Sequence, residues 1–179
     1  MGDEWCPICA TDRWPLAVAL ARFGKFSSLS LTKSSSSDSY PDTNTLSFAG
    51  ASYTSSFLTF SPVELQNRSR QNLETPTALQ QSIGVDLGHN TIPVIDFGGV
   101  YLVNGADYDP AALSDMTWQR MAAALGTPSD SSSHTVQQDV LGVANLYTAA
   151  ICKMTGDQPA DVCTSTGVKL ATTALTSSG

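Results

Sequence analysis

Two cysteines lie close together near the amino terminus, in the sequence Trp5-Cys6-Pro7-Ile8-Cys9. The apolar pattern that follows Cys9 is typical of a helix, so both thiols should lie in its first turn. The unpaired backbone amides and the dipole at a helix start favour an anion, and we expect a lowered pKa for Cys6. Pro7 lies where a missing amide hydrogen costs little. The motif therefore predicts dithiol-disulfide exchange, in which Cys6 attacks and Cys9 resolves the mixed disulfide.

Half of a zinc site has the same spacing as this motif. The sequence contains no second CxxC or HxxxH pair to complete such a site, and its two histidines, His89 and His134, are distant from each other and from the motif. Redox chemistry is therefore favoured over a structural zinc ion. We expect neither a bound metal nor a cofactor.

The other two cysteines, Cys152 and Cys163, flank a turn region that contains Gly156 and Pro159. We predict a structural disulfide between them, which ties the last long helix to the turn after it. A second exchange pair that relays electrons to the first is the alternative. Cysteines in two pairs indicate an oxidising compartment.

The composition excludes several classes of partner. Charged residues make up 14% of the chain and the formal net charge is -7, so no basic patch exists to bind nucleic acid or an anionic membrane surface. No run of about 18 apolar residues is present, which excludes a membrane-spanning helix. The start of the chain, Met1-Gly2-Asp3-Glu4, has neither the charge nor the apolar stretch of a secretory signal.

Apolar periodicity and turn residues predict the elements that must position the thiols. The first helix should run from Cys9 toward Gly24, and Pro15 should bend it or end its first turn. We expect residues 164–179 to fray, because little there must be buried. The other expected elements are a strand at 28–32, a loop at 34–37, a hairpin of 43–48 with 53–60, a helix capped by Thr75 and ending near Ile83, strands 91–97 and 100–103 joined by Gly98-Gly99, helix starts at Asp109-Pro110 and Thr117, a polar linker at 127–133 and a helix from Val136 to Met154.

At Thr91-Ile92-Pro93-Val94 the chain resembles thioredoxin-fold proteins, because an apolar strand and a Gly-Gly hairpin follow it in the order of that fold. The resemblance implies a cis-proline at Pro93, lying against Cys6, and an Ile92 backbone offered to an extended substrate strand. Trp5, Pro7 and Ile8 would complete the substrate-binding surface.

Two polar residues of the same region are further candidates. His89 could approach and tune the thiols, although an exposed loop position is favoured. Asp96 alternates with apolar neighbours and, if partly buried, could accept a proton from Cys9; an exposed strand carboxylate is the favoured alternative. Arg13 and Trp14, just past the motif, are expected to have packing or surface roles.

Several segments are similar to an uncharacterised prokaryotic family of thioredoxin-like proteins. That likeness implies an α/β thioredoxin-like domain at 1–126 with a hairpin-bearing insertion at about 34–74, and a helical extension at 127–179 in the same compact unit. One departure is that this fold has a buried strand directly before the CxxC motif. Here only five residues precede it, so that strand is truncated or another segment fills its place. The similar segments are Glu4–Ala10, Arg13-Trp14, 34–40, 53–55, 91–99 and 149–153.

Together these features predict a thiol-disulfide oxidoreductase that acts on protein thiols or disulfides. An extracytoplasmic oxidase or isomerase is favoured over a cytosolic reductase, and a membrane redox partner is compatible with that location. The rival is a non-catalytic binding module in which Cys6 and Cys9 form a structural bridge, and a metal carrier that uses both thiolates is a weaker third alternative. The oligomeric state does not follow from the sequence.

Overall fold

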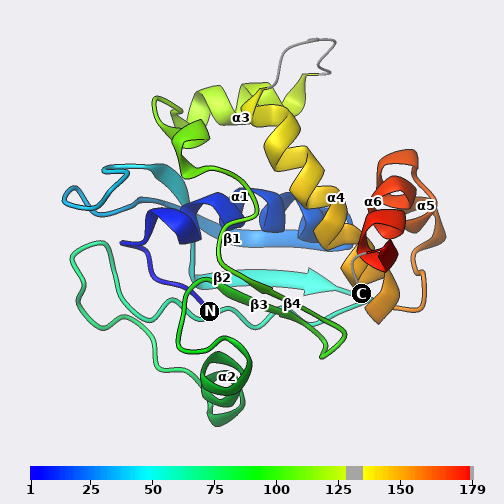
Figure 1. Ribbon diagram of the computed structural model, residues 1–179, viewed down its shortest axis with the longest axis horizontal. Coiled ribbons are helices and arrows are strands. Elements are labelled where there is room, and N and C mark those ends of the chain that lie inside the picture. The colour runs from blue at the N-terminus through cyan, green and yellow to red at the C-terminus, as the bar shows by residue number, and fades with distance from the viewer. Residues whose placement is uncertain (128–134, 178–179) are drawn as a thin grey trace.

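The computed structural model describes residues 1–127 and 135–177, so most of the expected linker at 127–133 lies outside the described residues. These residues form a mixed α/β structure with two small antiparallel sheets and six α-helices (Figure 1). The elements are α1 (Pro7–Ala21), β1 (Gly24–Lys33), β2 (Asn44–Ser55), α2 (Ala78–Ser82), a π-helical turn (Ile83–Leu87), β3 (Val94–Phe97), β4 (Tyr101–Asn104), a 3-10 turn (Pro110–Leu113), α3 (Trp118–Gly126), α4 (Val136–Met154), α5 (Ala160–Cys163) and α6 (Thr166–Ser177).

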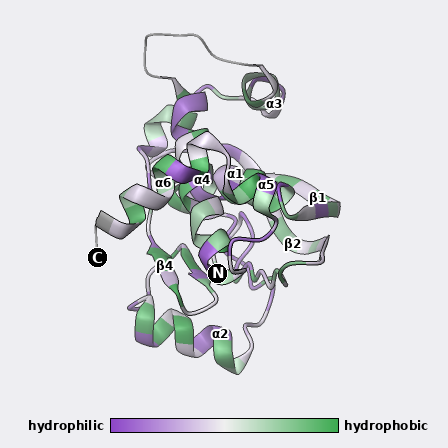
Figure 2. Ribbon diagram, turned by 90° about the vertical axis from the view of Figure 1, so that its right-hand side faces the viewer, coloured by the Kyte–Doolittle hydropathy of each residue, from purple (hydrophilic) through white to green (hydrophobic). Residues whose placement is uncertain are grey.

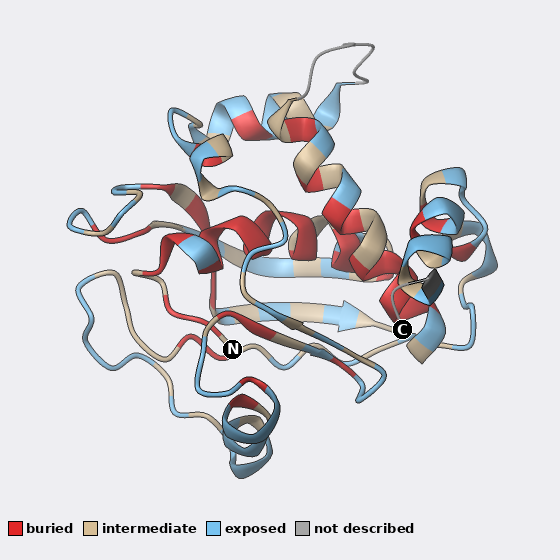
Figure 3. Ribbon diagram, in the orientation of Figure 1, coloured by how far each residue is buried: buried red, intermediate tan, exposed pale blue. Residues whose placement is uncertain are grey.

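Helix α1 is the central element of the structure. It packs between the β1–β2 pair and α4, and most of its residues are buried (Figure 3). It begins at Pro7 with Cys6 as its N-cap and ends at Ala21. Pro15 lies inside the helix, so of the two effects expected of it, ending the first turn is excluded. Burial on both sides outweighs the one backbone hydrogen bond that a proline cannot donate.

The predicted hairpin of 43–48 with 53–60 is wrong, because strand β2 runs through most of both segments. Asn44–Ser55 is one strand that pairs antiparallel with β1, and residues 56–60 are not part of it. Segment 49–52 bulges instead of turning, because Ser28 and Ser30 of β1 pair with Ser52 and Ser47 of β2. Gly50, with φ of 64°, has the left-handed backbone that such an irregularity requires.

The segment Met1–Glu4 lies between two extended stretches of chain. On one side Gly2 N donates to Val63 O at 3.1 Å and Leu65 N donates to Gly2 O at 2.9 Å. On the other side Met1 N donates to Val94 O at 2.7 Å and Val94 N donates to Met1 O at 3.0 Å. These few residues therefore occupy the position directly before the cysteine motif for which the sequence indicated a truncated strand.

Strands β3 and β4 form the hairpin expected from Gly98-Gly99. Phe97 pairs with Tyr101, and both glycines have positive φ, 62° and 72°, which a tight connection requires. The Ile92–Pro93 peptide bond before β3 is cis, as expected.

Helix α2 starts two residues later than expected. Thr77 caps it, and its side chain accepts from Gln80 N while Gln80 Oε1 accepts from Thr77 N. The π-helical turn then extends it to Leu87. Figure 2 shows this region as hydrophobic although it projects from the body of the protein, and its exposed apolar side chains include Leu79, Val85 and Leu87.

The carboxyl-terminal third is helical. Asp109 caps the 3-10 turn, Thr117 caps α3 and Thr135 caps α4. The structure thereby confirms the helix starts expected at Asp109-Pro110 and Thr117, and the long helix expected at 136–154. The fraying expected of residues 164–179 was wrong for residues 164–177, because α6 buries Val168 and Ala171 in the core beside α4. Residues 178–179 lie outside the described residues. None of the helices within 1–127 and 135–177 combines the length and apolar character needed to cross a bilayer.

Cys152 and Cys163 lie at disulfide distance, with 1.96 Å between their Sγ atoms. The bond joins the end of α4 to α5 and closes a short loop that contains Gly156 and Pro159. We expect the double variant Cys152→Ala/Cys163→Ala to lose about 2 to 3 kcal/mol of unfolding free energy, because the cross-link restricts the unfolded chain. Urea unfolding measures this loss, and Cys6→Ser/Cys9→Ser is the control for removing two sulfurs without this loop. An unchanged midpoint would show that the bond does not constrain the chain.

Candidate functional site

Cys6 and Cys9 lie in the first turn of α1, where the motif predicted them. Cys6 is the N-cap, and its Sγ accepts a hydrogen bond from Cys9 N at 3.1 Å. Both thiols are free and buried, with 4% and 2% of their surface exposed. A sulfur that accepts from a helical amide is favoured as an anion.

The two thiols differ in acidity. The pKa of Cys6 is lowered, chiefly by a hydrogen bond from the Cys9 side chain, and the amide of Cys9 and the charge of Arg13 add to this against the effect of burial. The pKa of Cys9 is raised well above its ordinary value, chiefly by burial. Cys6 is therefore the thiol that more readily forms the nucleophilic thiolate, whereas Cys9 favours its protonated form.

The residues beside the cysteines fall into two kinds. Ile8 is exposed at 37%, whereas Pro7 is buried. Trp5 is held from two sides, because its Nε1 donates to Gln66 Oε1 at 3.0 Å and the guanidinium carbon of Arg70 lies 3.6 Å from its ring centroid. Ile8 is thus the accessible apolar side chain next to Cys6.

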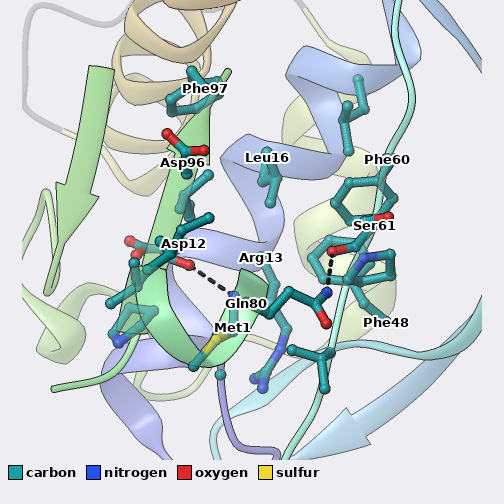
Figure 4. Close-up of a pocket in the computed structure, with 18 of the residues that line it drawn as sticks. Met1, Asp12, Arg13, Leu16, Phe48, Phe60, Ser61, Gln80, Asp96 and Phe97 are labelled. Carbon is teal, nitrogen blue, oxygen red and sulfur yellow. Dashed lines mark hydrogen bonds between the residues drawn. The ribbon is translucent and has the colours of Figure 1, made fainter. Parts of the chain in front are cut away.

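A cavity of about 340 Å³ lies beside Cys9 and Pro93 (Figure 4). Its floor is α1, its walls are residues 58–64 and 93–98, and Gln80 of α2 lies over it and donates to Ser61 O at 3.0 Å. The pairing of Met1 with Val94 places Pro93 near the start of the chain. Ile92 is half-buried and does not line the cavity.

A buried ion pair lies behind the thiols. Arg13 Nε and Nη2 donate to the two carboxylate oxygens of Glu64 at 2.8 and 2.6 Å, and the exposed fractions of the two side chains are 4% and 3%. Arg13 Nη2 also donates to Asp3 O at 2.7 Å. The pKa of Arg13 is raised, because the Glu64 carboxylate and the two sulfurs outweigh the burial that would lower it. Arg13 is a buried charge, which the sequence did not predict.

Two more acidic side chains near the site are buried. Burial is the main cause that raises the pKa of Asp3. Burial also raises the pKa of Asp12 well above its ordinary value, and the charge of Asp107 raises it further. Asp12 lines the cavity together with Cys9. Cys9, Asp12 and Arg13 share one face of α1 at helical spacing, which was a usable sequence signal. Glu64, far away in the chain, gave none.

The other candidates are exposed or shape their own loops, although Asp96 lines the same cavity as Cys9. Asp96 is exposed and its Oδ1 accepts from Gly99 N at 2.9 Å, as in the favoured alternative. His89 is also exposed, in agreement with the favoured loop position. The Ser34 hydroxyl bonds Tyr40 O and Thr43 N, so it shapes its loop. Within the described part of the chain, no group of three His, Cys, Asp or Glu side chains could hold a metal ion.

The order of thiol acidities gives a labelling prediction. Because the pKa of Cys6 is lowered and that of Cys9 is raised, iodoacetamide should label Cys6 first at neutral pH. Its rate should reach half-maximum below an ordinary thiol pKa of about 8.5, whereas Cys9 in Cys6→Ser should need a higher pH. Peptide mass spectrometry after timed labelling measures both rates. Faster labelling of Cys9 would contradict the assignment.

Asp12 gives a prediction for stability against pH. A carboxyl whose pKa is raised on folding holds its proton more tightly in the folded state, so unfolding free energy falls as pH rises from about 3.9 through the folded value. Asp12→Asn removes this dependence. We expect the variant to be more stable than wild type at pH 8, with a difference that shrinks toward pH 4. Denaturant unfolding across that range is the measurement, with the exposed Asp161→Asn as control, and a constant difference would refute the expectation.

Comparison with known proteins gives a family match for the amino-terminal half of the chain. A family described as a domain of unknown function, DUF929, matches residues 1–90, which include Cys6, Cys9 and Glu64. Neither the curated proteins nor the solved structures gave a match. The prediction of an uncharacterised family is confirmed, whereas the match does not test a thioredoxin-like character. Since the matched region is half of the chain, the protein belongs to the DUF929 family.

Proposed function

We propose that this protein exchanges disulfides with protein substrates through Cys6 and Cys9. The observation that carries the proposal is the unequal pair at the start of α1, where Cys6 Sγ accepts from Cys9 N and the two pKa values move in opposite directions. A low-pKa thiolate followed one turn later by a protonated thiol is the arrangement that exchange requires. No cofactor takes part in this proposal.

A thioredoxin-like arrangement is part of the same proposal. It is supported by the chain order, in which the cysteine helix, the strand after Ile92-Pro93, a Gly-Gly hairpin and further helices follow one another. The position of Met1–Glu4 between residues 63–66 and β3 also supports it, because that segment leads directly into the cysteines.

The reaction has two steps. The Cys6 thiolate attacks one sulfur of a substrate disulfide, which forms a mixed disulfide and releases the other substrate sulfur as a thiolate that takes up a proton. Cys9 then loses its proton and attacks Cys6 Sγ, so the Cys6–Cys9 bond forms and the second substrate thiol leaves. The substrate gains two electrons and two protons: the protein supplies both electrons and the Cys9 proton, and water returns the proton that Cys6 released when its thiolate formed. The reverse sequence oxidises a substrate dithiol.

The oxidising direction and an extracytoplasmic location are favoured. A second cysteine pair at disulfide distance, Cys152 with Cys163, supports an oxidising compartment. Hydrogen bonds to the Cys6 sulfur stabilise the reduced form, and a stabilised reduced form makes a disulfide a stronger oxidant. Substrates would be protein thiols, and a membrane-bound partner would reoxidise the pair.

The burial of both sulfurs favours a second candidate. With 4% and 2% of their surfaces exposed, Cys6 and Cys9 could instead form a structural bridge in a non-catalytic binding module. Such a bridge would resist reduction, whereas an exchange pair would be reduced readily.

Turnover separates the two candidates. We expect wild type to catalyse insulin reduction by dithiothreitol and oxidative refolding of a reduced protein, and Cys6→Ser to abolish both, because it removes the attacking sulfur. Cys9→Ser should accumulate a mixed disulfide, visible as a mass increase on denaturing analysis without reductant. Cys152→Ala/Cys163→Ala is the control that keeps the exchange pair. Activity equal in wild type and Cys6→Ser, or a Cys6–Cys9 bond that resists dithiothreitol, would refute exchange.

A further inference from the structure

The buried Arg13–Glu64 pair is not explained by stability. Both side chains are almost fully removed from water, and Arg13 Nη1 has no hydrogen-bond partner within the described residues. Removing two charges from water costs about as much as their attraction returns, so apolar residues of similar size would serve the fold equally well. A pair of this kind in this position therefore points to a role at the site.

The pair is connected to both cysteines. Asp3 O accepts hydrogen bonds from Cys6 N at 3.2 Å and from Arg13 Nη2 at 2.7 Å, so one carbonyl joins the guanidinium to the attacking residue. A Cβ atom added at Gly2 would lie 3.4 Å from Cys9 Sγ and 3.6 Å from Glu64 Oε2. The carboxylate and the Cys9 sulfur therefore contact the same side of Gly2.

The charges around Cys9 come from three segments. The amino-terminal segment contributes the Met1 ammonium and Asp3, α1 contributes Asp12 and Arg13 as well as Cys6, and residues 63–66 contribute Glu64. Burial favours the protonated form of both aspartates. Burial also lowers the pKa of the Met1 amino group, so it favours the neutral form of that group too. The Arg13–Glu64 ion pair is therefore the charge near Cys9 that substitution can test.

We propose that Arg13 is a positioning residue whose charge stabilises the thiolates of the exchange pair, and that Glu64 holds it in place and limits its effect. The inference rests on the proposed exchange function. It concerns chiefly the second step, in which Cys9 gives up its proton to water and attacks Cys6 Sγ while the substrate sulfur leaves. A positive charge close to Cys9 lowers the cost of that thiolate, because burial otherwise favours the protonated form.

The two members of the pair give opposite predictions. Arg13→Met removes the cation and leaves the carboxylate, so thiolate formation should move to higher pH and the reaction with an aromatic disulfide reagent at pH 7 should slow about tenfold. Glu64→Gln removes the anion, so thiolate formation should move to lower pH. Arg13→Lys keeps the charge and should lie near wild type. Thiolate absorbance at 240 nm is measured against pH for each variant of the full chain. Each variant is made in two backgrounds: one that keeps both cysteines, and one that carries Cys6→Ser, in which Cys9 titrates alone.

If the pair had only a structural role, the pH of thiolate formation would shift in the same direction in Arg13→Met and Glu64→Gln, or in neither. That outcome would overturn the inference. If Arg13→Met does not fold, Arg13→Met/Glu64→Gln buries no unpaired charge, and its thiolates should form at higher pH than in wild type because the cation is gone; Glu64→Gln alone still has to shift thiolate formation to lower pH. Insulin turnover is measured on the same samples. Opposite titration shifts without turnover in wild type would refute the exchange function and leave the charge assignment standing, whereas turnover with unshifted thiols would refute only the assignment.

Discussion

The backbone of Met1–Glu4 is hydrogen-bonded on both sides, to residues 63–66 and to Val94, and the geometry of the site depends on this constraint. A strand between two partners has its direction and register determined by both, so the chain leaves it toward α1 in one way. Cys6 then becomes the N-cap of α1, because Cys6 N bonds Asp3 O within the same turn of chain. The same pairing brings the segment with Pro93 to the cavity that Cys9 lines. Groups distant in the sequence thus meet through a few backbone hydrogen bonds.

The surroundings of the thiols contain far more buried polarity than the fold requires. Asp3, Asp12, Arg13 and Glu64 are all buried around one turn of α1, while Leu16, Ala19 and Leu20 farther along the helix belong to the apolar core that α4 shares. Each such group lowers stability unless it is well paired, and the raised pKa of Asp12 shows that its charge is not compensated there. Proteins retain costs of this kind where function needs them. The exchange function proposed above would give these charges a role, because they lie around Cys9 and act on its proton.

What the sequence predicted correctly depends on local signals. The cysteine spacing, the threonine caps of α3 and α4, and Gly98-Gly99 between two β-rich runs each act within a few residues, and their elements appear as expected. The errors came from long-range packing. Segment 49–52 reads as a turn, yet β1 pairs along both of its sides and makes it a bulge. The tail reads as polar, yet α4 offers a surface on which α6 buries two small apolar residues. Glu64 became part of the site only because its segment pairs with Gly2.

The burial of Cys6 and Cys9 has to be weighed against their hydrogen bonds, because the two features favour different functions. Burial alone raises the pKa of a thiol and shields a disulfide from attack, which suits a permanent bridge. Bonds from Cys9 to the Cys6 sulfur instead stabilise the thiolate, which exists only in the reduced form. A permanent bridge gains nothing from them, since a disulfide sulfur is a poor acceptor. The exposed Ile8 within the motif offers an apolar contact through which a partner can approach Cys6. The hydrogen bonds therefore favour a pair that alternates between reduced and oxidised states over one that only holds the fold together.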